Sequence, residues 1–195
     1  MTTHISQING LNMDVLQKTV DDVRQNPELG ACKFRVKNSW IDGGHNCSVI
    51  HDFYAAKQEM VHDDTFALHA DEPAMLAGND QGANPVEHLL HALASCVTTS
   101  MVAHAAVRGI NIDEVHSEIE GDIDLRGFLG LDDSVPKGFT NIRVKFSVKA
   151  DVDDLNKLKE LCAFSPVYNT LTNGVPVDID IQELQPSEWS LETGV

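Results

Sequence analysis

Basic residues are scarce in this sequence. Its 195 residues contain 14 Lys and Arg against 30 Asp and Glu, a formal net charge of -16 at pH 7. Such a surface repels the phosphates of nucleic acids and the anionic head groups of lipids. We therefore expect no nucleic acid and no membrane as a partner, and we expect any small-molecule substrate to be neutral or apolar.

Targeting signals and membrane-length apolar runs are also lacking. No segment reaches the roughly 18 unbroken apolar residues that span a bilayer, and no basic region followed by an apolar one marks a secretory signal at the N-terminus. The four cysteines (Cys32, Cys47, Cys96 and Cys162) are too sparse for a disulfide framework. The composition predicts a cytoplasmic protein with reduced thiols and a single main domain.

Hydrophobic periodicity predicts an α+β fold. Helical spacing of apolar residues marks the segments 11–26, 85–108 and 152–163. Alternation typical of strands marks 34–41, 48–54, 65–69, 114–125, 140–150 and 175–184. A turn at Asp42-Gly43-Gly44 joins the first two strands and places Cys47 opposite Trp40, so a disulfide from Cys47 to Cys32 is not expected. Strands grouped around two later helices are typical of the α+β class.

The most informative segment is the long helix predicted over residues 85–108. Asn84, Pro85 and Glu87 occupy the N-cap, N1 and N3 positions that begin a helix. The residues that follow are apolar on nearly every side, which predicts a buried helix. Cys96 lies in its middle, so its thiol is either a small packing group or a nucleophile sheltered from water.

Two motifs resemble the OsmC/Ohr family of osmotically inducible and organic hydroperoxide resistance proteins. Residues 84–96, NPVEHLLHALASC, and the small-residue helix that follows to Arg108 are similar to the family's central helix. Residues 165–171, SPVYNTL, with VPV at 175–177 are similar to its second motif. The resemblance covers about residues 31–184. It implies an N-terminal helical extension (1–30), an OsmC-like domain (31–185) and a polar tail (186–195).

The resemblance implies a fold and an activity. The fold is one of antiparallel sheets wrapped around long central helices, in an intertwined homodimer with active sites at the subunit interface. The activity is that of a thiol-dependent peroxidase for small apolar organic hydroperoxides, recycled by an external dithiol reductant. No cofactor and no metal are implied.

The resemblance assigns the first step of that reaction to two residues, a cysteine and a cation beside it. The attacking species is a thiolate, and a nearby cation stabilises it. Cys96 falls on the position of the family's peroxide-attacking cysteine. His45, after Gly43 and Gly44, stands where the family has an arginine, and we expect it to activate the thiol more weakly because a histidine is largely neutral at pH 7.

Two further catalytic residues of the family, a glutamate and a second cysteine, are displaced by one to three positions in this sequence. Val86 occupies the position of the family's glutamate, and Glu87 follows it. Ser165 occupies the position of the second cysteine, and Cys162 precedes it by three residues. A second thiol protects an oxidised cysteine from over-oxidation by closing a disulfide. We therefore predict Cys96, Cys162, His45 and Glu87 as catalytic residues and a Cys96–Cys162 disulfide after oxidation.

Each of these residues also has a structural interpretation. Glu87 fits a capping box, Ser165 fits the N-cap of the next helix, Cys162 fits helix packing, and His45 fits a solvated hairpin tip. A zinc site built on His88 and His91 is a further alternative that lacks an evident third ligand. The alternative function is a non-catalytic OsmC-like protein that binds a small molecule in an apolar pocket and retains Cys96.

Overall fold

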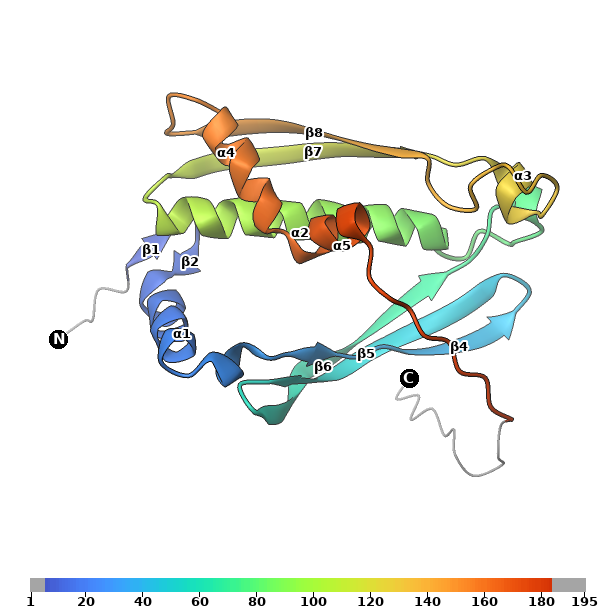
Figure 1. Cartoon of the computed structure of the whole chain (residues 1–195), viewed down its shortest axis with the longest axis horizontal. Coiled ribbons are helices and arrows are strands. Elements are labelled where there is room, and N and C mark those ends of the chain that lie inside the picture. The colour runs from blue at the N-terminus through green and yellow to red at the C-terminus, as the bar shows by residue number, and fades with distance from the viewer. Residues whose placement is uncertain (1–5, 184–195) are drawn as a thin grey trace.

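The computed structural model describes residues 6–183. Its centre is the long helix α2 (Pro85–Val107). A two-stranded hairpin and the C-terminal helices cover one side of α2, and a four-stranded antiparallel sheet lies on the other (Figure 1). The arrangement confirms the predicted α+β class.

The N-terminal extension begins with a small hairpin and continues into a helix. Its elements are β1 (Gln7–Ile8), β2 (Leu11–Asn12), α1 (Met13–Gln25) and the 3-10 turn η1 (Pro27–Gly30). The helix predicted over 11–26 is therefore confirmed. Its start is fixed by the Asn12 side chain, which accepts hydrogen bonds from the backbone N–H groups of Asp14 and Val15.

Asn9 ties this extension to the rest of the molecule. Its Nδ2 donates to the carbonyl of Ile110 at 3.0 Å, and its Oδ1 accepts from the backbone N–H of Ile112 at 2.8 Å. Both partners follow the end of α2. Asn9 has a φ of 54°, a left-handed conformation that asparagine tolerates better than most residues. The extension is thus attached to the end of the central helix by a side chain that satisfies two backbone groups.

The four-stranded sheet is built around its central strand β5. Its members are β3 (Lys33–Phe34), β4 (Lys37–Asp42), β5 (His45–Ala55) and β6 (Gln58–Ala70). The strand predicted at 65–69 is longer than expected, because Ala56 and Lys57 form a two-residue turn with positive φ without any glycine to signal it. Cys47 pairs with Ser39 rather than with Trp40, because the register shifts between Trp40 and Asp42.

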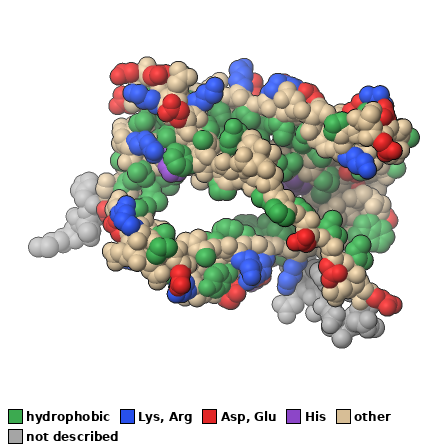
Figure 2. Space-filling model, in the orientation of Figure 1, with side chains coloured by type: hydrophobic (Ala, Val, Ile, Leu, Met, Phe, Trp, Pro, Cys, Tyr) green, Lys and Arg blue, Asp and Glu red, His purple; other side chains and the backbone are tan. Residues whose placement is uncertain are grey.

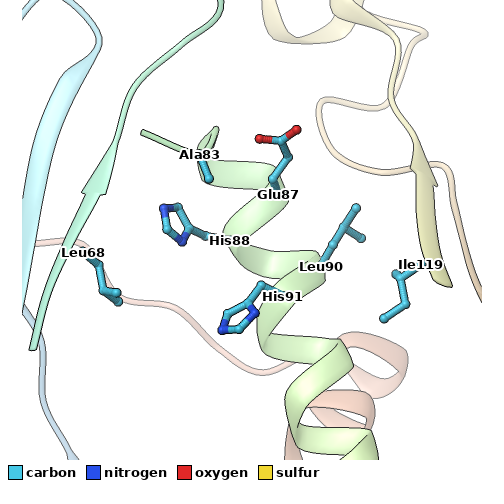
Figure 3. A pocket seen from close by; sticks show the side chains of 7 residues that line it. All are labelled: Leu68, Ala83, Glu87, His88, Leu90, His91 and Ile119. Carbon is cyan, nitrogen blue, oxygen red and sulfur yellow. The ribbon is translucent and has the colours of Figure 1, made fainter. Parts of the chain in front are cut away.

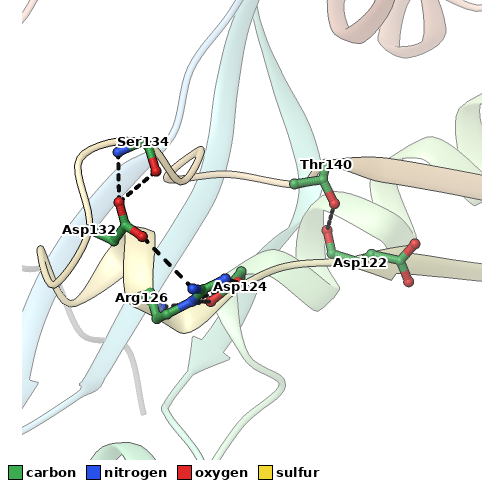
Figure 4. Close-up of polar contacts among 6 residues, drawn as sticks. All are labelled: Asp122, Asp124, Arg126, Asp132, Ser134 and Thr140. Atoms are coloured by element: carbon green, nitrogen blue, oxygen red, sulfur yellow. Dashed lines mark hydrogen bonds and ion pairs between the residues drawn. The ribbon is translucent and has the colours of Figure 1, made fainter.

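The second sheet is the hairpin of β7 (Ile112–Asp122) and β8 (Asn141–Ala150). Its connection contains the short helix α3 (Leu125–Phe128), which the sequence did not predict. Figure 4 shows why this loop is ordered: Arg126 pairs with Asp124 and Asp132, and Asp132 accepts hydrogen bonds from Ser134. Local carboxylate contacts of this kind stabilise a turn without a hydrophobic pattern.

The C-terminal helices pack on α2. They are α4 (Asn156–Leu161), the 3-10 turn η3 (Cys162–Phe164) and α5 (Pro166–Asn173). The helix predicted over 152–163 is therefore shorter and ends in a 3-10 turn. Ser165 caps α5, since its Oγ accepts from the backbone N–H of Tyr168 at 3.1 Å, which confirms the N-cap interpretation. The core here consists of Met101, Ala105, Leu158 and Leu161.

The strand predicted over residues 175–184 is absent from residues 175–183, and Leu184 and the tail 186–195 lie outside the described residues. Among residues 6–183 this segment has no strand partner, although its apolar residues alternate. Those side chains are exposed, and that of Ile181 reaches 89%. Alternation predicts a strand only where a neighbouring strand shares its hydrogen bonds, and the described part of the chain places no strand beside this segment.

Helix α2 is buried on one side only, so the prediction of all-round burial is wrong for the single chain. Its buried residues are Leu93, Val97, Met101, Ala105 and Ala106. The space-filling view shows an opening between the layer that contains α2 and the four-stranded sheet (Figure 2). By length and composition alone α2 could also cross a membrane, a property that core helices of soluble proteins share.

His104 secures the end of α2 to η3. Its ring stacks on Phe164 with centroids 3.9 Å apart, and Arg108 lies over the same ring. Burial, together with the positive charge of Arg108, lowers the pKa of His104 below its usual value. The folded chain therefore favours the neutral imidazole at this position.

This shift predicts a pH dependence of stability. A histidine whose pKa is lower in the folded state contributes stability that is present above about pH 6.5 and is lost as the pH falls through the folded value. We expect the urea midpoint to fall between about pH 7 and pH 5, and we expect the His104→Phe variant, which keeps the stacking, to reduce that fall. The exposed His116→Gln variant is the control, and an unchanged pH dependence in His104→Phe would contradict the assignment.

Candidate functional site

Cys96 lies on the uncovered side of α2. At 3.6 residues per turn it is about 140° around the helix from Met101 and about 180° from Ala105. Those two residues belong to the core beneath the C-terminal helices. Cys96 is half-buried and forms no disulfide. Its thiol thus points away from the core that Met101 and Ala105 form beneath the C-terminal helices.

Cys162 lies on the other side of α2. It begins η3 and packs against the core formed by Met101, Ala105, Leu158 and Leu161. Its Sγ contacts the carbonyl of Leu158 at 3.6 Å, and burial raises the pKa of the thiol. Cys162 therefore packs against a face of α2 that is about 140–180° around the helix from Cys96.

Glu87 closes the first turn of α2. Its carboxylate accepts from the backbone N–H of Asn84 at 2.8 Å, while Oδ1 of Asn84 accepts from Val86 at 2.9 Å. This is the reciprocal arrangement of a capping box, so that interpretation of Glu87 is confirmed. Its carboxylate is already occupied two and a half turns before Cys96.

A cleft with a volume of about 570 Å³ adjoins this end of α2. Figure 3 shows His88 and His91 pointing from α2 toward the side of Leu68, whereas Leu90 points toward Ile119. The cleft combines aliphatic walls with two imidazoles and the Glu87 carboxylate, a lining that suits a small molecule with one polar group. Within residues 6–183 no three His, Cys, Asp or Glu side chains can hold a metal ion together, so His88 and His91 gain no third ligand there.

His45 is placed against His69 rather than beside Cys96. Its Nε2 lies 2.9 Å from Nδ1 of His69, and the two rings are 5.2 Å apart. His88, from α2, contacts the carbonyl of His69 at 3.0 Å. The pair therefore lies at the N-terminal end of α2, and Cys96 is about 12 Å further along the helix axis than His88.

Asp71 lies next to this histidine pair. The residue is 1% exposed. Burial alone raises the pKa of its carboxyl, but hydrogen bonds from the backbone N–H groups of Gln81, Glu72 and Asn79, with the nearby His45, outweigh burial and hold that pKa below its usual value. Asp71 is therefore a buried carboxylate around which the loop between β6 and α2 is folded.

Sequence reasoning missed His69 and Asp71. The signal that could have found His69 is the register of the β5–β6 hairpin, in which His69 pairs with Cys47 and so lies diagonal to His45. That signal was hidden because β6 was predicted too short. No local sequence pattern predicts the role of Asp71, because the backbone N–H groups that it binds lie up to ten residues away.

Comparisons with known proteins identify a family and a shared fold. A family model described as OsmC-like protein matches residues 78–180, just over half of the chain.

The solved OsmC-like protein from Mycoplasma pneumoniae is 16% identical, with a TM-score of 0.54 over 73% of this chain and 89% of that one. An OsmC-like protein of unknown function from Vibrio cholerae is 11% identical, with a TM-score of 0.53 over 73% of this chain and 93% of that one. At these identities the structures show a shared fold. No curated protein sequence matches the chain.

The positions of the thiols predict their order of reaction. Cys32 is exposed, Cys96 is half-buried, and burial raises the pKa of Cys162. Since the thiolate is the reactive form, iodoacetamide at about pH 8 should alkylate Cys32 first and Cys162 last. Peptide mass spectrometry after timed quenching measures each rate, with urea-unfolded protein as the reference for equal access. Alkylation of Cys162 as fast as that of Cys32 in the folded chain would contradict this placement.

Proposed function

Because the chain belongs to the OsmC-like protein family, we propose that it is a thiol-dependent peroxidase that reduces organic hydroperoxides through Cys96. One observation supports this function above all: a half-buried thiol in the middle of α2, on the side turned away from the chain's own packed core. A thiol there is accessible to a small molecule, because it is only half-buried and lies away from the core beneath the C-terminal helices.

The proposed reaction has two stages. The Cys96 thiolate attacks the outer oxygen of the hydroperoxide, so an S–O bond forms, the O–O bond breaks, and the alkoxide takes a proton and leaves as an alcohol. The cysteine is now a sulfenic acid. A thiol then displaces its hydroxyl as water and forms a disulfide, and a second thiol releases reduced Cys96.

The position of Cys162 indicates whether the thiol that attacks the sulfenic acid comes from this chain or from an external reductant. A disulfide needs Cα atoms within roughly 7 Å of each other, and Cys162 packs on the side of α2 opposite to Cys96. Its position favours an external dithiol as the direct reductant of the sulfenic acid. The predicted internal disulfide between Cys96 and Cys162 would require η3 to leave the core.

The proposal predicts activity that depends on Cys96. With dithiothreitol as reductant, the protein should consume cumene or tert-butyl hydroperoxide faster than hydrogen peroxide, and Cys96→Ser should fall to background. Cys32→Ser, which removes an exposed thiol, is the matched control and should keep the wild-type rate. Equal background rates for wild type and Cys96→Ser would refute the peroxidase function. A peptide map after one equivalent of peroxide then separates a mixed disulfide at Cys96 from an internal one.

We also propose that the protein is a homodimer. Residues 175–183 carry an apolar face without a strand partner, and β3 and β4 expose Phe34 and Trp40. The uncovered side of α2 and the opening beside it add further apolar surface (Figure 2). Extensive exposed apolar surface marks an interaction site, so we infer that a second copy of the chain covers it.

Sedimentation should show a mass near twice 21.4 kDa at micromolar concentration. The double variant Ile179→Lys/Ile181→Lys should shift the mass toward the monomer, because it places charges on the exposed apolar face. Asp178→Asn/Asp180→Asn alters the other face of the same segment and should leave the mass unchanged. A wild-type monomer would contradict the proposal, and would also remove the interface at which the family resemblance places the active site.

One observation favours the alternative of a non-catalytic binding protein. Two of the three residues predicted to assist Cys96 are engaged elsewhere, Glu87 in the capping box and His45 with His69. The cleft beside His88 and His91 would then be the binding site, and Cys96 would be a packing residue. A cytoplasmic location without nucleic-acid or membrane partners stays a prediction from composition.

A further inference from the structure

We propose that a second cleft, between the start of β8 and helix α5, binds a neutral and mainly apolar molecule that carries a hydroxyl group. The cleft has a volume of about 300 Å³, at the lower end of the range for ligand pockets. It shares no lining residue with the cleft beside His88 and His91. It is therefore a separate place on the molecule, and its lining decides which ligand fits.

The walls of this second cleft are apolar and come from three parts of the fold. Helix α2 contributes Leu93, which is only 4% exposed, and α5 contributes Leu171. The chain that enters and forms β8 contributes Phe139 and Val144. Among the described residues, none that lines the cleft carries a charge. A charged ligand would give up hydration here without gaining an ion pair, so the lining selects a neutral molecule.

Both walls are held in place by the fold. A Cβ atom on Gly121 of β7 would lie 2.5 Å from Cε1 of Phe139, so the Phe139 ring occupies space that any larger residue at position 121 would need. On the other side, α5 is fixed by its N-cap, Ser165, and by Asn169, whose Nδ2 donates to the carbonyl of Ala163 at 2.7 Å. The cleft is therefore formed before a ligand enters.

The two threonine hydroxyls in the lining can accept a hydrogen bond but have no proton left to donate. Oγ1 of Thr140 donates to the carbonyl of Asp122 at 3.2 Å (Figure 4), and Oγ1 of Thr172 donates to the carbonyl of Tyr168 at 2.9 Å. A hydroxyl has one proton and two lone pairs, so each threonine keeps lone pairs for a ligand. Only a ligand that donates a hydrogen bond can use them.

Asn141 and Tyr168 complete the polar lining. An amide and a phenol can each donate as well as accept a hydrogen bond. An alcohol can pair with all of these groups, because its hydroxyl both donates and accepts. An ether of the same shape can only accept, and it cannot pair with the threonines. The lining therefore favours an alcohol over the corresponding ether.

The cleft lies close to Cys96. Leu93 precedes Cys96 by three residues on α2, so their Cα atoms are about 4.5 Å apart along the helix axis and about 60° apart around it. An organic hydroperoxide ends in an O–H group, and its reduction yields an alcohol, so substrate and product both belong to the class that the lining favours. Resting on the proposed peroxidase function, this cleft holds the organic group of both. Binding itself is measured without that function.

An NMR titration of the full-length protein with 2-phenyl-2-propanol, the alcohol formed from cumene hydroperoxide, tests the assignment without turnover. The titration extends to about 10 mM, since a small ligand of this kind binds weakly. The methyl signals of Leu93, Val144 and Leu171 should shift. The wild type should bind the alcohol at least about threefold more tightly than its methyl ether, because one hydrogen bond of ordinary strength changes Kd by about that factor.

Substitutions of Thr172 separate the shape of the cleft from its polarity. Thr172→Trp should fill the cleft and abolish measurable binding of both compounds. Thr172→Val keeps the shape, removes one hydroxyl and should lower the preference for the alcohol. Thr170→Trp and Thr170→Val are the matched controls and should bind as the wild type does, because Thr170 is exposed on the same helix and does not line the cleft.

Three results would overturn the proposal: no binding of the alcohol by the wild type, equal affinity for the alcohol and the ether, or unchanged binding in Thr172→Trp. The peroxidase assay is read separately. A protein that binds the alcohol in this cleft but consumes no hydroperoxide keeps the site and refutes only the peroxidase function. An active peroxidase that does not bind the alcohol keeps that function and refutes the site.

Discussion

The packing of one side of α2 against the C-terminal helices and the β7–β8 hairpin is the interaction on which the other features depend. Met101 and Ala105 on α2 meet Leu158 and Leu161 on α4. Burial of each large aliphatic side chain contributes about 1.5–3 kcal/mol, so this core anchors the helix firmly. Because only one side of α2 is used in this way, the opposite side remains available to a substrate or to a second chain.

This one-sided packing also decides what the cysteines can do. Cys162 belongs to the core, where burial raises the pKa of its thiol, whereas Cys96 projects from the opposite side. The two sulfur atoms are similar in chemistry and differ in what surrounds them. Ser165 shows the same principle, since its hydroxyl is buried and used to cap α5. Ser165 of the second motif thus caps α5, and the nearby Cys162 thiol packs against the core.

The two halves of the molecule are held by different forces. Around α2 and the C-terminal helices the contacts are mainly apolar, and His104 links their stability to pH. The N-terminal sheet is attached through imidazoles, carboxylates and backbone hydrogen bonds around Asp71. Apolar packing responds little to protons, whereas a hydrogen bond between two histidines needs a free lone pair.

The sequence alone determined the α+β class, the limits of α2, its capping by Asn84 and Glu87, and the place of Cys96 at its centre. Each of these follows from local spacing, because caps and helical periodicity depend on residues within one or two turns. Local signals failed where partners are distant. The glycine-free turn at Ala56 and Lys57 hid the length of β6, and the alternation of residues 175–183 could not show that no strand lies beside them.

Only the tertiary structure decided which side of α2 is covered. An apolar helix has several faces that could be buried. The face that is buried depends on where the C-terminal helices pack after the β7–β8 hairpin. That return places Cys162 on the side opposite to Cys96. It was also the tertiary structure that brought His69 and Asp71 to His45, because contacts between neighbouring strands and a loop depend on register and not on distance along the chain.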